Sequence, residues 1–429
     1  MKTRKTWSGF GTEAVVAGCA CVLACSHAFA QFGPFDFSEV TALAEGAVTG
    51  QTTATPIRGF DLQIMKNGVV VYHRAFGQWS LDQLANADSA TKTLSGAMMI
   101  AIADSSALPF SLDSRLSDFV PSFAGNKASI TIRQCFAHTS GLGSSTAVGS
   151  STLTLRQAAD QIALVPLAFS PAGSAFSYGG TSMHAAGAAA EVAGGKPWNA
   201  LFEERLARPL GLRNTRYALT TPSNPRIAGG AESTASDFAR FMEMLRREGE
   251  SVEGRRVLSG AGAREIFRRQ TAPGIAILNT PLDSPTTDGA DYGVGVWLAV
   301  RAPDGRLRGA LAAGARGFTS WIDFDRGVVG VLATDISASG NVQPLIYELF
   351  GAAGAAVERP RCPSDLNYDR VVDNRDFALF VEGYNIVDCA ETQPWDLTGC
   401  TADLDRDGSV DTTDFALFAT AYNAFLCLP

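Results

Sequence analysis

The chain has 429 residues, of which 46% are hydrophobic and 18% charged, and its formal net charge is −8. This length accommodates a large domain and a smaller module. The acidic excess lies in residues 362–429, which hold 13 acidic and 3 basic residues. No basic patch is present, so nucleic acid is excluded as the expected partner.

The N-terminal segment has the pattern of an export signal. A basic start at residues 1–5 precedes an apolar run at 14–24, and the small residues Ala28 and Ala30 flank a cleavage site before Gln31. We expect residues 1–30 to be removed and the mature protein to be secreted, periplasmic or held at the cell surface. A lipoprotein site at Cys19 is the alternative, but cleavage there would leave another apolar run. No later run has membrane-spanning length, so no transmembrane anchor is expected.

Hydrophobic periodicity predicts an α/β fold with an antiparallel sheet flanked by helices. Residues 62–75 alternate around Asn67 and Gly68, which indicates a β-hairpin. Later strands are expected at 293–300, 318–323 and 327–334, a closing helix near 342–350, and other helices at 90–103, 155–164, 181–192 and 235–247. We expect these elements to form one large domain over residues 31–352. A stretch rich in Ala, Gly and Pro follows, and we expect residues 353–361 to form a linker to a module at 362–429.

Ser89 and Lys92 are the strongest candidates for catalysis. One helical turn separates them, so both side chains leave the same helix face and can share a hydrogen bond. Serine is a poor nucleophile without an adjacent base, and partial burial keeps a lysine amine neutral. The chain has six lysines, of which Lys92 alone follows a serine by three residues. A phenol such as that of Tyr178 would then pass the proton to the leaving group.

Other nucleophiles are less well supported. No Gly-x-Ser-x-Gly is present, which argues against an α/β-hydrolase. His138 lies in a loop, where a histidine bonded to the backbone is the favoured interpretation. Cys135 has mostly apolar neighbours and is expected to be a buried, inert thiol.

Two segments of the C-terminal module have the ligand pattern of an EF-hand calcium loop. Residues 365–376 and 403–414 place oxygens at loop positions 1, 3, 5, 9 and 12, with a backbone carbonyl at position 7. The second segment and the sequence after it repeat the first in register. We expect two Ca²⁺ sites, the first weaker because Arg370 stands where the sharp turn prefers glycine. The expected ligands are Asp365, Asn367, Asp369, Val371, Asp373 and Asp376, and then Asp403, Asp405, Asp407, Ser409, Asp411 and Asp414.

Four cysteines of the module follow the same repeat. The spacing from Cys362 to Cys389 equals the spacing from Cys400 to Cys427. We expect two disulfides, and the sequence leaves all three connectivities open.

Several ordered motifs resemble the serine β-lactamase-related family, which includes class C β-lactamases, family VIII-type carboxylesterases and D-alanyl-D-alanine carboxypeptidases. The motifs lie at residues 87–93, 137–142, 176–181, 209–212, 228–239 and 292–297. The resemblance covers roughly residues 35–352. It implies a β-lactamase/transpeptidase-like fold, in which the sheet is built from both chain ends, a helical lobe is inserted, and the serine lies in the cleft between them.

This resemblance makes Ser89 the acylated nucleophile, Lys92 its activator and Tyr178 the general base and acid. The backbone N–H groups of Ser89 and Ala315 would form the oxyanion hole.

Two family elements are altered in this chain. Gly180 replaces the asparagine of the Tyr-x-Asn element, and so removes an amide that would contact Lys92 and the substrate. The third element, usually Lys-Thr-Gly or His-x-Gly on an edge strand, is placed at residues 312–314, where Gly314 is kept and the cation is lost. We expect Gly180, Gly314 and Arg316 to contact substrate, with Arg316 as the candidate replacement for the cation.

The calcium repeat resembles a type I dockerin, a small all-α EF-hand-like module. The resemblance implies a cohesin-like protein partner. Aspartate at loop position 12 agrees with it, whereas the four cysteines depart from ordinary dockerins.

The sequence therefore predicts a secreted serine hydrolase that forms an acyl-enzyme on Ser89 without a catalytic cofactor. Its substrate would be a small ester, a lactam or a D-amino-acid amide, with the ester favoured because an ester leaves more readily than an amide. The alternative is a catalytically impaired relative that acts as a ligand-binding or assembly protein, which the changes at Gly180 and Ala312 favour.

Overall fold

The computed structural model describes residues 30–31, 35–282, 284, 287–336, 342–358, 364–366, 372–384, 402–405 and 409–424. Almost all of the expected signal peptide lies outside these residues, as do Cys362, Cys389, Cys400 and Cys427. Among the described helices, none combines the length and apolar character needed to span a membrane.

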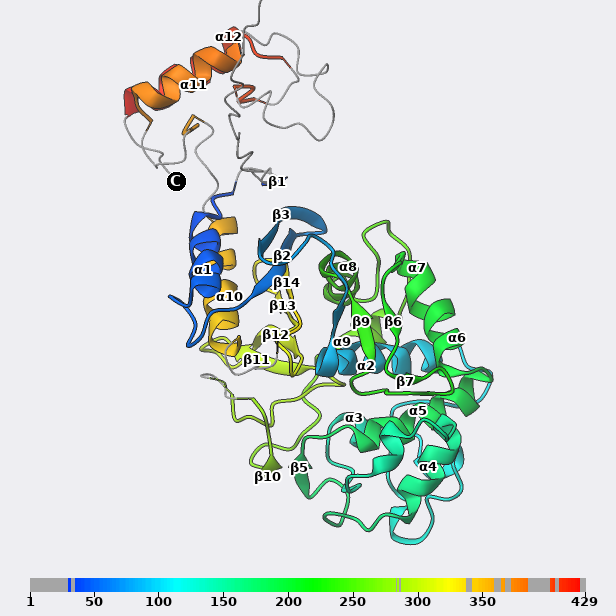
Figure 1. The fold of residues 1–429 in the computed structure, drawn as a ribbon. Helices are drawn as coiled ribbons and strands as arrows, with labels where there is room; N and C mark the ends of the chain where they lie inside the picture. The colour runs from blue at the N-terminus through cyan, green and yellow to red at the C-terminus, as the bar shows by residue number, and fades with distance from the viewer. Residues whose placement is uncertain are drawn as a thin grey trace, which may run out of the picture.

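A seven-stranded antiparallel sheet forms the centre of the large domain, in the order β1-β3-β2-β14-β13-β12-β11 (Figure 1). Its β2-β3 hairpin turns at Asn67 and Gly68, both with positive φ, as predicted. Because β14 pairs with β2, the sheet joins the two ends of the domain. The strands are β1 (Ala30–Gln31), β2 (Gly59–Lys66), β3 (Val69–Gly77), β11 (Trp297–Arg301), β12 (Leu307–Ala313), β13 (Thr319–Asp323) and β14 (Val328–Ala333).

Helices cover both faces of this sheet. On one side α1 (Ser38–Thr49) packs against α10 (Gln343–Glu358), and on the other α8 (Ala235–Arg246) packs on β2, β13 and β14 (Figure 1). Helix α10 continues beyond the expected residue 350, and Ala353, Ala356 and Val357 are buried in the core. The alanine-rich stretch expected as linker is therefore largely helical. Alanine suits both a flexible segment and a closely packed helix, so composition alone was ambiguous.

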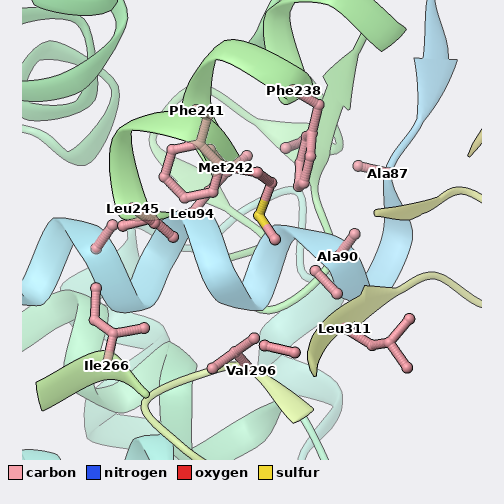
Figure 2. Close-up of a cluster of buried hydrophobic side chains, with 14 of the residues drawn as sticks. Ala87, Ala90, Leu94, Phe238, Phe241, Met242, Leu245, Ile266, Val296 and Leu311 are labelled. Atoms are coloured by element: carbon pink, nitrogen blue, oxygen red, sulfur yellow. The ribbon is translucent and has the colours of Figure 1, made fainter. Parts of the chain in front are cut away.

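Helix α2 (Thr91–Ala103) lies at the junction between the sheet and the helical lobe (Figure 1). All of its residues except Ala103 are buried. Figure 2 shows it between Phe238 and Met242 of α8 on one side and Ile266 and Val296 on the other. This packing fixes the start of α2, and Ser89 lies in the turn just before it.

The inserted lobe and its connections supply the remaining elements. The expected helices at 155–164, 181–192 and 235–247 match α4, α5 and α8 closely, and the predicted architecture is confirmed. The helices are α3 (Ile132–Phe136), α4 (Leu155–Leu164), α5 (Thr181–Gly194), α6 (Trp198–Phe202), a π-helix (Glu203–Ala207), α7 (Arg208–Leu210) and α9 (Gly260–Ile266). The short strands are β4 (Ala85–Asn86), β5 (Ala175–Ser177), β6 (Arg216–Tyr217), β7 (Thr220–Thr221), β8 (Asn224–Pro225), β9 (Ala231–Ser233) and β10 (Ala276–Asn279). Single 3₁₀ turns occur at Asp88–Ala90, Leu116–Asp118, Gly125–Lys127 and Thr146–Gly149.

The C-terminal module has its own small core. Helices α11 (Asn374–Tyr384) and α12 (Thr412–Ala424) each begin in the last three residues of one of the predicted calcium loops. The Phe380 and Phe418 rings stack with centroids 4.8 Å apart, and these two residues are equivalent in the sequence repeat. The core residues are Leu366, Val372, Phe380, Ala402, Leu404, Val410 and Phe418.

Candidate active site

Ser89 lies in the 3₁₀ turn Asp88–Ala90 that leads directly into α2. Lys92, one turn further on, is buried and hydrogen-bonded to Ser89, with 2.8 Å between Nζ and Oγ. The predicted pair is therefore present, with the serine in the turn before the helix and the lysine within the helix.

The Lys92 amine has a strongly altered pKa. Burial, aided by repulsion from Arg226, lowers this pKa to about 7, while Asp88 opposes both effects. Nζ also donates a hydrogen bond to the Ala228 carbonyl at 2.9 Å. This carbonyl supplies a partner for Lys92 although Gly180 provides no amide, and a Cβ on Gly180 would lie 3.2 Å from the Ala228 methyl. A substantial fraction of Lys92 is therefore neutral near pH 7 and can accept a proton.

Tyr178 follows β5 and is held by its backbone and its ring. Its N–H donates to the Asn279 carbonyl at 3.0 Å, and Asn279 Nδ2 donates back to the Tyr178 carbonyl at 2.8 Å. The ring stacks on Trp297 with centroids 5.2 Å apart, and Lys92 Nζ lies 4.6 Å from its centre. Burial raises the pKa of the Tyr178 phenol to about 12, and this effect outweighs a hydrogen bond with Ser89 that lowers the pKa. The phenol is therefore protonated at neutral pH and suited to donate a proton.

His138 supports the tyrosine from behind. It is buried, its backbone has a φ of 58°, and its ring centroid lies 4.5 Å from that of Tyr178. Nδ1 accepts a hydrogen bond from the Gly179 N–H at 3.3 Å, in agreement with the expectation of a backbone-bonded loop histidine. Burial and the nearby Lys92 hold the pKa of His138 well below its usual value, so the ring is neutral. Cys135 is also buried, and burial raises the pKa of its thiol.

A pocket with a volume of about 180 Å³ opens over Ser89 and Tyr178. Of the described residues that line it, none is charged and most are apolar. The remaining lining residues are Pro281, Leu282, Trp297, Leu311, Ala313, Gly314, Ala315, Thr319, Gln343, Ile346 and Tyr347. The sequence did not indicate Trp297 as a wall of this pocket, because its contact with Tyr178 joins segments that lie far apart in the chain.

The loop between β12 and β13 brings a second backbone donor to the pocket. Gly314 lies so close to the nucleophile turn that a Cβ on it would stand 2.4 Å from the Ala87 carbonyl oxygen, so only glycine fits. Ala315 follows and lines the pocket. Among the described residues, neither the Ser89 N–H nor the Ala315 N–H has a hydrogen-bond acceptor, and both residues line the pocket.

The strand that carries residues 312–313 is not the edge strand expected from the family pattern. Strand β11 lies outside β12, and the sheet ends there. Their pairing stops at Trp297 and Leu311, however, so Ala312 and Ala313 extend past β11 and pair with β13 alone. The strand is internal, but its end at the pocket is locally an edge.

We expected Arg316 to contact substrate, but it is not among the described residues that line the pocket. Its Nε and Nη2 atoms each donate to an Asp88 carboxylate oxygen at 2.9 Å, and its backbone N–H donates to the same carboxylate at 3.0 Å. Nη1 lies 3.2 Å from Asp335. The two carboxylates already balance this cation, so it is not a replacement for the lost substrate-binding charge.

In the second predicted calcium loop, Asp403, Asp405 and Asp414 place carboxylate oxygens within 4.8 Å of one another. The buried Asp414 accepts hydrogen bonds from the N–H groups of Leu404 at 2.6 Å and Asp411 at 2.8 Å. Carboxylate oxygens are the ligands that calcium prefers, so this loop fits the ion.

The first predicted calcium loop shares one of these hydrogen bonds. Asp376, the equivalent of Asp414, is buried and accepts from the Asp373 N–H at 3.0 Å. Of the other predicted ligands, the structure describes Asp365, Ser409 and Asp411. The remaining four lie outside the described residues: Asn367, Asp369, Val371 and Asp407.

Comparisons with known proteins match both parts of the chain. The Beta-lactamase family model matches residues 44–349, and the Dockerin type I domain model matches residues 363–420. Penicillin-binding protein 4 of Amycolatopsis lactamdurans is 29% identical over 266 residues, which are 53% of this chain and 67% of that protein.

Solved structures share the fold of the large domain. A penicillin-binding protein homologue from Caulobacter crescentus has a TM-score of 0.61 and 19% identity over 77% of this chain and 100% of its own. EstCE1, a hydrolase with promiscuous acyltransferase activity, has a TM-score of 0.60 and 19% identity over 74% of this chain and 97% of its own.

Proposed function

Because the chain belongs to the beta-lactamase family of serine hydrolases and ends in a dockerin type I domain, we propose that it is an exported esterase that forms an acyl-enzyme on Ser89. The observation that carries this proposal is the 2.8 Å contact between Ser89 Oγ and a buried lysine amine whose pKa is about 7. A nucleophile and a base poised near neutral pH are the two groups that acyl transfer needs first.

The proposed reaction has two steps. Neutral Lys92 accepts the Ser89 hydroxyl proton as Oγ attacks the substrate carbonyl, and the N–H groups of Ser89 and Ala315 stabilise the oxyanion. The Tyr178 phenol donates its proton to the leaving group and recovers one from Lys92, so the enzyme ends the step acylated and with unchanged charge. Water then attacks the acyl group with the same residues acting in reverse, and releases the acid and free Ser89.

We infer a neutral, apolar substrate from the pocket. A carboxylate bound there would lose water without gaining a cation among the described lining residues, and Arg316 is engaged by Asp88 and Asp335. Penicillins and peptides that end in a free carboxylate are therefore disfavoured. Esters are favoured over amides because Gly180 supplies no side-chain amide to the site.

The C-terminal domain supports a tethering role. Dockerin type I domains generally bind calcium and typically bind cohesins. We propose two calcium sites, with Asp403, Asp405 and Asp414 among the ligands of the second, and a cohesin-like partner that holds the hydrolase outside the cytoplasm. The ion would stabilise the module and take no part in hydrolysis.

A ligand-binding protein without turnover is the second candidate. The changes at Gly180 and Ala312 favour it, because each removes a polar side chain that the family pattern places near the reacting bond.

Intact-mass spectrometry of the wild type and of Ser89→Ala separates the two proposals. The protein is exposed to a fluorophosphonate, a p-nitrophenyl ester and a penicillin. We expect adducts from the first two on the wild type and none on Ser89→Ala. Folded wild type without any adduct would favour the binding protein.

A further inference from the structure

The two proposed oxyanion donors come from segments far apart in the chain. Ser89 stands in the turn before α2, and Ala315 stands in the loop between β12 and β13. An oxyanion hole is effective only when its donors are held in place before the reaction begins. Some contact between the two segments must therefore set the distance between these N–H groups.

The residues next to the two donors make that contact. Asp88 precedes Ser89, Arg316 follows Ala315, and the two side chains form a bidentate ion pair with both N–O distances at 2.9 Å. The Arg316 backbone N–H adds a third hydrogen bond to the Asp88 carboxylate at 3.0 Å. A planar guanidinium fork fixes orientation as well as distance, which a single charge cannot do.

Further hydrogen bonds hold the far side of Arg316. Nη1 contacts Asp335, and Asp335 accepts a hydrogen bond from Asn86 Nδ2 at 2.8 Å. The Arg316 carbonyl accepts from the Ile336 N–H at 2.8 Å. The β12-β13 loop is thus held by the segment after β14 and by the residues that lead into the nucleophile turn.

Asp88 adopts a backbone conformation that needs such support. Its φ is 45°, in the left-handed region that non-glycine residues adopt at an energetic cost. Hydrogen bonds from Arg316 to its carboxylate offset that cost and so stabilise the turn that presents Ser89.

We propose that Asp88 and Arg316 are positioning residues that hold the Ser89 and Ala315 N–H groups at the spacing the oxyanion requires. The inference rests on the proposed acyl transfer. It assigns Arg316 a role within the site that needs no contact with substrate, in place of the anion-binding role that its sequence position indicated.

The test is a double-mutant cycle on the full-length protein with a neutral p-nitrophenyl ester. Arg316→Ala and Asp88→Ala should each lower kcat roughly 10- to 100-fold and leave KM within about two-fold, because the lost stabilisation belongs to the transition state. The double variant should be no slower than the slower single variant, since one pair is lost in every case.

Arg306→Ala is the matched control. Arg306 forms a bidentate pair with Asp325 at the opposite end of β12. Its loss should leave kcat and KM unchanged. Arg316→Lys keeps a cation without the fork, so it provides a second variant if Arg316→Ala does not fold, and it should still lower kcat.

Three results would overturn the inference: kcat for Arg316→Lys and Arg316→Ala within three-fold of wild type, losses that multiply in the double variant, or a loss expressed in KM alone. Wild type that neither turns over the ester nor takes up the fluorophosphonate would instead overturn the proposed function, and this inference with it.

Discussion

The Lys92 amine lies 2.8 Å from the Ser89 hydroxyl and is buried, and these two facts determine the expected behaviour of the site. The contact lets the amine take the serine proton. The burial keeps the amine neutral at a pH where an exposed lysine would be charged.

The rate of ester hydrolysis should rise with pH and level off above an inflection near pH 7. Neutral Lys92 is the proposed base, and burial lowers its pKa to about 7. No falling limb is expected below about pH 10, because the Tyr178 phenol pKa is raised to about 12. Plots of kcat/KM against pH test this.

Arg226→Gln removes a positive charge that repels protonated Lys92, and should move the inflection upward by roughly half a pH unit. An inflection that stays in place in Arg226→Gln would contradict this account of the Lys92 pKa.

Lys92→Met should abolish acylation and stabilise the fold. The Lys92 pKa is about 7 in the folded protein against an ordinary value of 10.5, so between these pH values the unfolded chain binds more protons. Wild-type stability should therefore rise as pH increases through this window, and the variant should lack that contribution. At pH 7 we expect Lys92→Met to gain about 1 to 3 kcal/mol in urea unfolding. Lys196→Met, at an exposed ion pair with Glu204, is the control and should change little. A destabilised Lys92→Met would show that the buried amine is better compensated than we infer.

The site should prefer neutral acyl groups over charged ones. With p-nitrophenol as the common leaving group, kcat/KM for the butyrate should exceed that for the hemisuccinate at least about 10-fold, because a carboxylate is desolvated in this pocket without a cation. Gln343 lines the pocket and is close to lysine in length, so Gln343→Lys should narrow the preference. Steady-state kinetics measures both ratios. Equal kcat/KM values for the two esters would contradict the proposal of an apolar substrate.

Calcium removal should unfold the C-terminal module and leave hydrolysis intact. Chelation would leave the carboxylates of the loops, including the buried Asp376 and Asp414, without their counter-charge. Circular dichroism and ester turnover, recorded together with and without a chelator, test this.

Calorimetry should find two calcium sites, of which Asp403→Ala removes the tighter and Asp365→Ala the weaker. Equal affinities would contradict the expected effect of Arg370, and no calcium uptake would contradict both sites.

Local patterns predicted much of the fold and the first half of the site. The three-residue spacing of Ser89 and Lys92, the turn at Asn67 and Gly68 and the bounds of α4 depend on neighbouring residues, so they could be read from the chain. The family matches confirm the resemblance that these motifs indicated. The pair between Asp88 and Arg316 could not be predicted in the same way. It joins residues 228 positions apart and depends on the order of strands in the sheet.

Composition misled where one residue type serves two purposes. The alanines after residue 350 suggested a linker, yet they pack as the last turns of α10 because small side chains allow close approach to the sheet and α1. For strand β12, the sequence indicated only the final residues, through the family motif at 312–314. Its other residues do not alternate regularly between apolar and polar, so they gave no strand signal.

The sheet is completed by β14, the last strand of the domain in chain order, and this order bears on when the enzyme can become active. Ser89, Lys92 and Tyr178 are all present once synthesis has passed Tyr178, but the loop with Ala315 and the strand that completes the sheet come last. A chain that is still being synthesised, or one truncated before Gly314, would hold the nucleophile and its base without the second oxyanion donor. On the proposed mechanism, we therefore expect acylation only after nearly the whole domain has been made and folded.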